Sequence, residues 1–70
     1  MSDNVYKLIE LVGSSSTSTD DAIRNALARA SKQLHNLDWF EVSEIRGHVA
    51  ESGNVGYYQV KLKVGFRLDE

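Results

Sequence analysis

The segment from Val55 to Leu68 constrains the fold more than any other part of the chain, because apolar and polar residues alternate along it. Successive side chains of a β-strand point to opposite faces, so this pattern predicts one long strand with an apolar face and a polar face. The apolar face carries Tyr58, Val60, Leu62, Val64, Phe66 and Leu68, and the polar face carries Tyr57, Gln59, Lys61, Lys63 and Arg67. An apolar face of this length must be covered, and we expect a helix to cover it.

A helix is predicted to begin at Ser18. Asp21 follows three residues later, which has the form of a capping box, and Asp20 and Asp21 suit the positive end of a helix dipole. Apolar residues then recur at steps of three and four and form one narrow stripe: Ile23, Ala26, Leu27, Ala30, Leu34 and Leu37. The alanines of this stripe permit close approach to a sheet. Basic residues occupy the later turns, where cations oppose the negative end of the dipole, namely Arg29, Lys32 and His35.

Two further strands are predicted. The first covers Val5 to Val12 and carries apolar side chains at both odd and even positions, which point to opposite faces of a strand. This pattern indicates burial on both faces. The tract 13–19 after it contains only Gly, Ser and Thr, and we interpret it as a polar connection because no phosphate-loop Gly-Lys-Ser/Thr follows.

The other strand covers Trp39 to Val49 and is rich in aromatic and β-branched residues. Gly47 is predicted to mark a β-bulge within it. Its residues divide between two faces, with Phe40 and Val42 on one and Trp39, Ser43 and Ile45 on the other.

The order of these elements is β-α-β-β, with a turn at Glu51 to Asn54 joining the last two strands as an antiparallel hairpin. Placing the last strand between the other two makes every neighbouring pair antiparallel. We therefore predict a single α+β domain over residues 1–70, in which a three-stranded antiparallel sheet wraps around one helix. One helix covers only one face of a sheet. The opposite face, with Gln59 and Trp39, is left open for a partner subunit or a ligand.

A chain of 70 residues without cysteine has few means of stabilising a small core. At this size folding buries only about 60% of the surface of the unfolded chain, so the hydrophobic gain nearly cancels the cost of ordering. Disulfides are excluded, and only His35 and His48 offer imidazole to a metal. We expect no metal site, and we expect self-association to supply the missing burial.

Charge and hydropathy narrow the class of protein further. The chain has a net charge of −2 and an isoelectric point near 5.6, so it lacks the excess of basic residues that is typical of nucleic-acid-binding proteins. The longest unbroken apolar run is Ala26 to Ala28, and the first ten residues are polar and mixed in charge. These features predict no membrane span, signal peptide or second domain, and a soluble cytoplasmic protein.

Candidate catalytic groups are scarce. The sequence contains no pattern of a nucleophile, a histidine and an acidic residue typical of nucleophilic catalysis, and no glycine-rich nucleotide-binding motif. We therefore predict no enzymatic activity. Trp39 suits core packing, an interface anchor or a stacking platform. Gln59 suits either a solvated surface or an amide that binds the edge of a planar heteroaromatic ring. Arg46 suits a phosphate, a carboxylate or an interfacial salt bridge.

Several segments in sequence order resemble the dodecin family of flavoproteins, and together they extend over nearly the whole chain. They are Val-Tyr-Lys at 5–7, Glu-Leu-Val-Gly-Ser-Ser at 10–15, Asp-Trp-Phe-Glu-Val at 38–42, Ile-Arg-Gly at 45–47, Tyr-Gln-Val at 58–60 and Val-Gly-Phe-Arg-Leu at 64–68. The fold of that family is the β-α-β-β arrangement reached above. The resemblance implies that twelve copies assemble into a hollow homododecamer.

The resemblance also implies a ligand. Dodecins bind flavins in pairs, with two isoalloxazine rings stacked between tryptophans of two-fold-related copies. Trp39 matches that tryptophan, and Gln59 matches the glutamine that hydrogen-bonds the ring edge. Asp38 and Arg46 match positions near the flavin, and Arg46 is the expected phosphate partner if the ligand is FMN rather than riboflavin. Some bacterial members also bind coenzyme A, through residues that align with Arg29 and Arg67.

The implied function is storage and sequestration of flavin, in which the stacked indole quenches the excited state without substrate turnover. One alternative is a structural or adaptor oligomer that keeps the shell and has no flavin role. A second alternative is a small flavin-dependent oxidoreductase, for which the chain offers no nicotinamide-binding motif.

Overall fold

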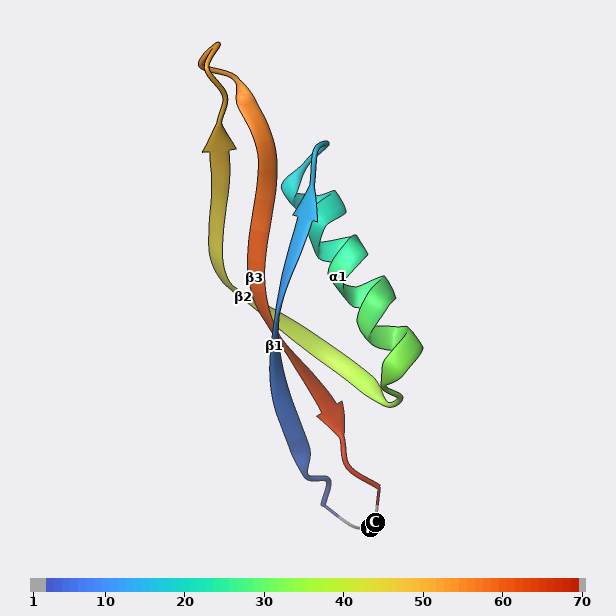
Figure 1. Ribbon diagram of the computed structural model, residues 1–70. Coiled ribbons are helices and arrows are strands. Elements are labelled where there is room, and N and C mark those ends of the chain that lie inside the picture. Colours follow the sequence, from blue (N-terminus) through green and yellow to red (C-terminus); the bar gives the residue numbers. More distant parts are fainter. Residues whose placement is uncertain (1–2, 70) are drawn as a thin grey trace.

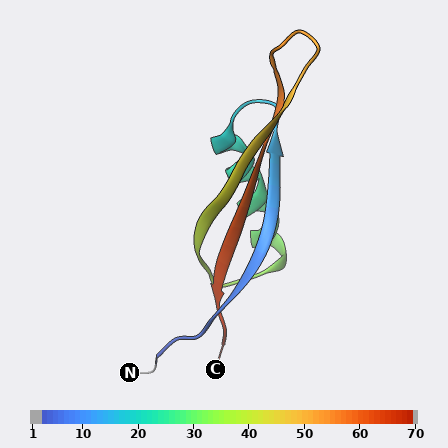
Figure 2. The same ribbon diagram turned by 90° about the vertical axis from the view of Figure 1, so that its left-hand side faces the viewer.

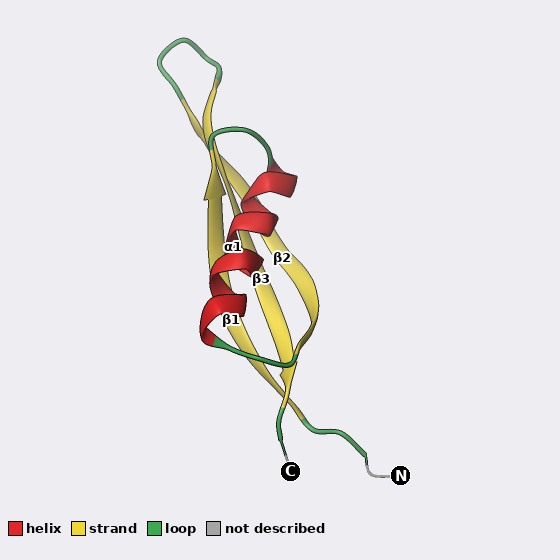
Figure 3. Cartoon of the chain, turned by 90° about the vertical axis from the view of Figure 1, so that its right-hand side faces the viewer, coloured by secondary structure: helices red, strands yellow, loops and turns green. Residues whose placement is uncertain are grey.

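The computed structural model describes residues 3–69, which form one helix and three strands (Figure 1). The elements are β1 (Tyr6–Ser15), α1 (Thr19–Gln33), β2 (Leu37–Val49) and β3 (Val55–Arg67). The strands form one sheet in the order β1-β3-β2, and both pairings are antiparallel. Helix α1 lies against one face of this sheet (Figure 3). The predicted α+β class, the order of the elements and the central position of the last strand are confirmed.

The start of α1 follows from the side chains of the loop before it. Oγ of Ser18 accepts a hydrogen bond from the backbone N–H of Asp21 at 3.0 Å, as the capping pattern predicts. The carboxylate of Asp21 accepts instead from Oγ of Ser15, at 2.7 Å. Ser15 is buried, and its Oγ also accepts from the backbone N–H groups of Thr17 and Ser18. Ser15 therefore joins the end of β1 to the first turn of α1.

Helix α1 ends earlier than the apolar stripe predicts. Leu34 is the C-cap residue, and its N–H donates to the carbonyl oxygen of Ala30 at 2.9 Å. Asn36 follows with a φ of 64°, in the left-handed region that asparagine tolerates, and the chain turns there into β2. Leu37 therefore packs against the core from β2, and His35 lies outside the helix.

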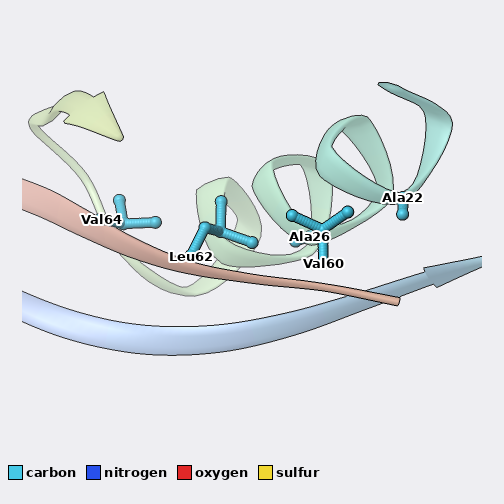
Figure 4. Packing of buried hydrophobic residues seen from close by; sticks show 5 residues of the cluster. All are labelled: Ala22, Ala26, Val60, Leu62 and Val64. Atoms are coloured by element: carbon cyan, nitrogen blue, oxygen red, sulfur yellow. The ribbon is translucent and has the colours of Figure 1, made fainter. Parts of the chain in front are cut away.

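The core is one thin layer between α1 and β3 (Figure 4). Its buried members are Ala22, Ala26, Val60, Leu62 and Val64. Partly buried side chains surround them, namely Ile9, Leu11, Ile23, Leu27 and Leu37. Close approach of α1 to the sheet also requires Gly13 of β1. A Cβ there would lie 3.0 Å from the Cβ of Ala26 and 2.9 Å from the carbonyl carbon of Ala22.

Strand β1 is apolar on both faces, but only one of them is covered. Ile9 and Leu11 lie on the side of α1, next to the buried residues of β3. The side chains on the opposite face are exposed: Tyr6, Leu8 and Val12. The prediction of burial on both faces is therefore wrong for the single chain, because one helix covers only one side of the sheet.

The register of β2 against β3 shifts at Asp38, at Ser43 and between His48 and Val49. Gly47 is paired with β3, so the prediction of a bulge at Gly47 is wrong. The extra residue at Ser43 reverses the alternation of the side chains beyond it, so Ile45 falls on the side of α1. Ile45 accordingly pairs with the buried Val60, and the prediction that Ile45 shares a face with Trp39 is wrong.

The molecule is elongated, with extents of 56 × 20 × 13 Å, and the β2–β3 hairpin projects beyond α1 (Figure 2). Its radius of gyration is 14.7 Å, against about 11 Å for a compact domain of this length. The accessible surface is 5190 Å², against about 4400 Å² expected from the mass. Large apolar side chains on all three strands contribute to this surface. The shape therefore supports the expected self-association.

Replacing Gly13 by alanine tests the close packing of α1 on β1. The added methyl group meets backbone and the Cβ of Ala26, so α1 must move outward. We expect the free energy of unfolding to fall by about 1–3 kcal/mol, measured by urea denaturation. The control is Ser16→Ala in the exposed loop, for which a change within about 0.5 kcal/mol is expected. Equal stability of Gly13→Ala and the wild type would contradict the packing described.

Candidate functional site

Within residues 3–69, no element covers the face of the sheet turned away from α1, which we call the open face. Directly paired residues share a face, so the register defines rows that cross it from β1 through β3 to β2. The tryptophan row contains Leu8, Gly65 and Trp39, and the amide row contains Ser14, Gln59 and Arg46. Two mainly charged rows lie between them, made of Glu10, Lys63 and Glu41 and of Val12, Lys61 and Glu44.

The indole of Trp39 lies directly over the backbone of Gly65. A Cβ on Gly65 would stand 2.7 Å from the indole Nε1, a distance that real side chains do not adopt. Glycine is therefore required at this position for reasons of space. Trp39 remains 42% exposed, so part of the ring surface is available for stacking.

The amide row is a chain of hydrogen bonds with one residue from each strand. Nε of Arg46 donates to Oε1 of Gln59 at 2.9 Å. Nε2 of Gln59 donates in turn to Oγ of Ser14 at 3.1 Å. The structure thus brings together two of the predicted site residues and adds Ser14, which the sequence did not indicate.

The tryptophan row and the amide row do not meet within one chain. Gly65, under the indole, and Gln59 are six residues apart on β3, which is about 20 Å along a strand. The charged rows fill this interval, and Nζ of Lys61 lies 3.7 Å from Oε1 of Glu44 there. The predicted ring-stacking residue and the predicted ring-edge residue are therefore separate in the single chain.

Asp38 is exposed at the start of β2, next to Trp39. It borders a groove of about 400 Å³ between β2 and α1 that Leu27, Phe40 and Val64 also line. Asp38 thus lies beside the predicted stacking residue, as the sequence indicates.

The two arginines aligned with coenzyme A contacts lie in different surroundings. Arg29 lines a groove of about 590 Å³ between α1 and β1, together with Asn25 and Lys32. Arg67 lies at the end of β3, where its Nη2 is 3.5 Å from Oδ1 of Asn36. Arg67 is not among the residues that line the groove beside Arg29.

A polar cluster surrounds Arg67 where the chain leaves α1. Nε2 of His35 lies 3.1 Å from Oδ2 of Asp69, and Nδ2 of Asn36 donates to Oδ1 of the same carboxylate at 2.8 Å. These two hydrogen bonds, that from His35 first, hold the pKa of Asp69 below its ordinary value of 3.8. The cluster links the segment after β3 to the connection between α1 and β2.

Within residues 3–69, no three His, Cys, Asp or Glu side chains gather into a group that could hold a metal ion. The single helix of this part of the chain is too short and too polar to cross a membrane.

The fold and the open face together define a small α+β protein that presents an exposed indole and a polar amide row on one uncovered sheet face. Comparison with known proteins identifies the family. The Dodecin family model matches residues 5–69, and the chain belongs to this family.

Its relatives span nearly its whole length. A dodecin of Thermus thermophilus is 61% identical over 66 residues, which is 94% of both chains. The solved dodecin of Streptomyces davaonensis is 52% identical, with a TM-score of 0.92 over 99% of this chain and 100% of that chain. The calcium dodecin of Mycobacterium tuberculosis is 32% identical over 93% of this chain and 90% of that protein. Its crystal structure is described as having a novel calcium-binding site.

Replacing Gly65 by alanine tests the support of the indole. The new methyl group occupies the space of the ring, so we expect Trp39 to turn toward solvent and its emission to shift to longer wavelength. Trp39 is the only tryptophan, so fluorescence reports on it alone. Ser16→Ala is the control, because Ser16 is exposed in the loop before α1. An unchanged emission maximum in Gly65→Ala would refute the close approach.

The Asp69 cluster predicts a dependence of stability on pH. A carboxylate whose pKa is lowered in the folded state stabilises that state above its unfolded pKa, and this stabilisation is lost as pH falls through the folded pKa. We therefore expect Asp69→Asn to unfold in less urea than the wild type at neutral pH, and the difference to vanish well below pH 3.8. Glu51→Gln in the hairpin turn controls for loss of one charge. A difference that persists unchanged in acid would show that Asp69 acts by another route.

Proposed function

We propose that the chain binds flavin, as FMN or riboflavin, and stores it in a homododecamer. Two isoalloxazine rings stack as a pair between the Trp39 indoles of two copies. Membership of the dodecin family supports this function. The observation that carries it is the indole of Trp39, half exposed and held over Gly65 on a sheet face that the chain leaves uncovered.

The position of Trp39 suits a stacking platform. The backbone of Gly65 supports the indole from one side, so the ring loses little further freedom when a ligand stacks on it. Offset stacking of aromatic rings contributes about 0.5–1.5 kcal/mol beyond the burial of their surface. Core packing alone would leave less of the ring exposed.

One complete flavin site requires more than one copy of the chain. Trp39 and Gln59 lie about 20 Å apart along β3, which is farther than a single isoalloxazine ring system reaches. The Gln59 that hydrogen-bonds a ring edge therefore belongs to a different copy from the Trp39 stacked on the same ring. The large exposed surface of the single chain supports the same association. The number of copies, twelve, comes from the family.

The chemistry of the stacked pair is quenching, with no substrate turnover. Trp39 donates an electron to a photoexcited flavin beside it and recovers the electron afterwards, so excitation ends with nothing consumed. Both histidines have contacts within the chain. His48 stacks on Tyr57 with ring centroids 5.1 Å apart, and His35 lies 3.1 Å from the carboxylate of Asp69.

Coenzyme A is the proposed second ligand, and the groove beside Arg29 favours it. Arg29 and Lys32 both line this groove, and two cations there suit phosphate groups. Arg67 lies elsewhere in the chain, so it reaches the same ligand only from another copy.

Titration of ligand-free protein into riboflavin and into FMN tests the flavin function through flavin emission. We expect saturable, nearly complete quenching at one flavin per chain, and loss of quenching in Trp39→Ala. Phe40→Ala is the matched control, because Phe40 is a neighbouring, similarly exposed aromatic residue whose side chain lies on the other face of the sheet.

Two results would favour the alternatives. Unchanged flavin emission with the wild type, together with loss of assembly in Trp39→Ala, would indicate a structural oligomer. Steady oxidation of NAD(P)H by the flavin-loaded protein would indicate an oxidoreductase. Sedimentation of the wild type and both variants measures the assembly in the same samples.

A further inference from the structure

A stacked pair of aromatic rings lies on the open face, one row beyond the amide row. Tyr57 and His48 are directly paired between β3 and β2. Their ring centroids are 5.1 Å apart, and the ring planes are inclined by 8°. Tyr57 is two residues from Gln59 along β3, so both side chains point to the same face. The pair therefore extends the open face toward the hairpin end of the sheet.

An irregularity in β3 makes room for this pair. Gly56 is the extra residue of β3 where the register shifts next to the pair of His48 and Tyr57. A Cβ on Gly56 would lie 2.9 Å from Cδ2 of His48, so a side chain there would displace the imidazole. Tyr57 remains 43% exposed, so its ring is in contact with water. The shift in register thus presents a phenol that is both stacked and exposed.

The pair lies close to the place that the proposed function gives to the isoalloxazine ring. Gln59 hydrogen-bonds the ring edge there, and Tyr57 is two residues further along the same strand, about 7 Å away. Trp39 of the same copy is farther, because Gly65 beneath its indole is about 26 Å from Tyr57 along β3. A flavin held at Gln59 therefore has two oxidisable rings near it, Trp39 of one copy and Tyr57 of the other.

We propose that Tyr57 is a second electron donor to the photoexcited flavin, which acts beside Trp39 in quenching. The inference rests on the proposed flavin function and adds a residue to it. An electron passes from the phenol of Tyr57 to the excited flavin, which is the oxidant, and the phenolic proton passes to water at the exposed ring. Both return when the charges recombine, so the cycle consumes nothing.

The surroundings of Tyr57 favour it over Tyr6, the other tyrosine of the open face. The face of an aromatic ring is negative, so a stacked neutral imidazole stabilises the positive charge that forms on the phenol of Tyr57. Tyr6 is instead directly paired with Arg67, whose charge opposes the removal of an electron. The arginine on the Tyr57 side, Arg46, lies one row away. Oxidation of Tyr57 is therefore less costly than oxidation of Tyr6.

The first test removes the tryptophan donor and keeps a ring for stacking. In flavin-loaded Trp39→Phe, we expect bound flavin to have a shorter excited-state lifetime than free flavin, measured by time-resolved fluorescence. Adding Tyr57→Phe should abolish this residual quenching, because phenylalanine is not oxidised by flavin. Tyr58→Phe is the matched control, since Tyr58 is the adjacent residue and its side chain points to the other face.

The outcomes separate the inference from the function on which it rests. Equal lifetimes in Trp39→Phe with and without Tyr57→Phe would overturn the inference. Loss of the residual quenching in Tyr6→Phe, with Tyr57 intact, would assign the donor to Tyr6 and overturn it as well. Failure of the wild type to retain flavin on gel filtration would instead overturn the flavin function.

The second test keeps Trp39 and so does not depend on binding to Trp39→Phe. Transient absorption of the flavin-loaded wild type after a blue pulse should show a tyrosyl radical, and Tyr57→Phe should lose this signal. His48→Val should reduce the signal, because the stacked ring is removed while the phenol stays. Absence of a tyrosyl radical in the wild type, or its persistence in Tyr57→Phe, would overturn the inference. Sedimentation confirms that each variant still assembles.

Discussion

The packing of the alanines of α1 against the apolar side of β3 is the contact on which the rest of this structure depends. It holds the only helix of residues 3–69 to the sheet and forms the whole buried core. Its extent is limited by geometry. A helix of 15 residues is about 22 Å long, whereas a strand of 13 residues is about 43 Å long. The helix therefore leaves uncovered about half of the inner face, at the hairpin end, together with the whole outer face.

Each face of the sheet has a glycine whose missing side chain lets another group pack closely against the backbone. Gly13 lacks a side chain on the inner face, which lets α1 approach the backbone of β1. Gly65 lacks one on the outer face, which lets the indole of Trp39 lie over the backbone of β3. The first close approach builds the core, and the second one holds an exposed aromatic ring on the open face. A side chain at either position would hold two groups apart that the fold requires in contact.

The residue pattern within each segment was sufficient to predict the helix, the strands and their order. It was insufficient for features that depend on contacts with another element, such as a bulge or the burial of a strand face. The alternation in β3 and the cap at Ser18 are local properties, and both are confirmed. The bulge at Ser43 depends on how β2 pairs with β3, and no residue within β2 marks it. Burial of β1 depends on how far α1 extends across the sheet.

In the candidate site, too, the sequence pattern did not indicate residues that are brought together only by strand pairing. The family resemblance indicated Trp39, Gln59 and Arg46, yet it could not indicate Ser14 as the partner of Gln59. Ser14 and Gln59 are 45 residues apart in sequence, and only the register of β1 against β3 brings their side chains together. Gly65 was equally hidden, although it interrupts the run of polar residues on the outer side of β3. That interruption of an otherwise regular pattern was the one signal in the sequence.

In the proposed assembly, the amide row must hold a ligand and also release it. Polar groups that become enclosed when copies associate are costly if they lose water and gain no partner. Ser14, Gln59 and Arg46 already hydrogen-bond one another, so the empty site keeps much of its polar bonding satisfied when copies associate. Under the proposed function, the ligand uses the donors and the lone pair that remain on these side chains, without breaking these bonds. The same bonds satisfy the polar groups of the proposed assembly when it is empty, as reversible storage requires.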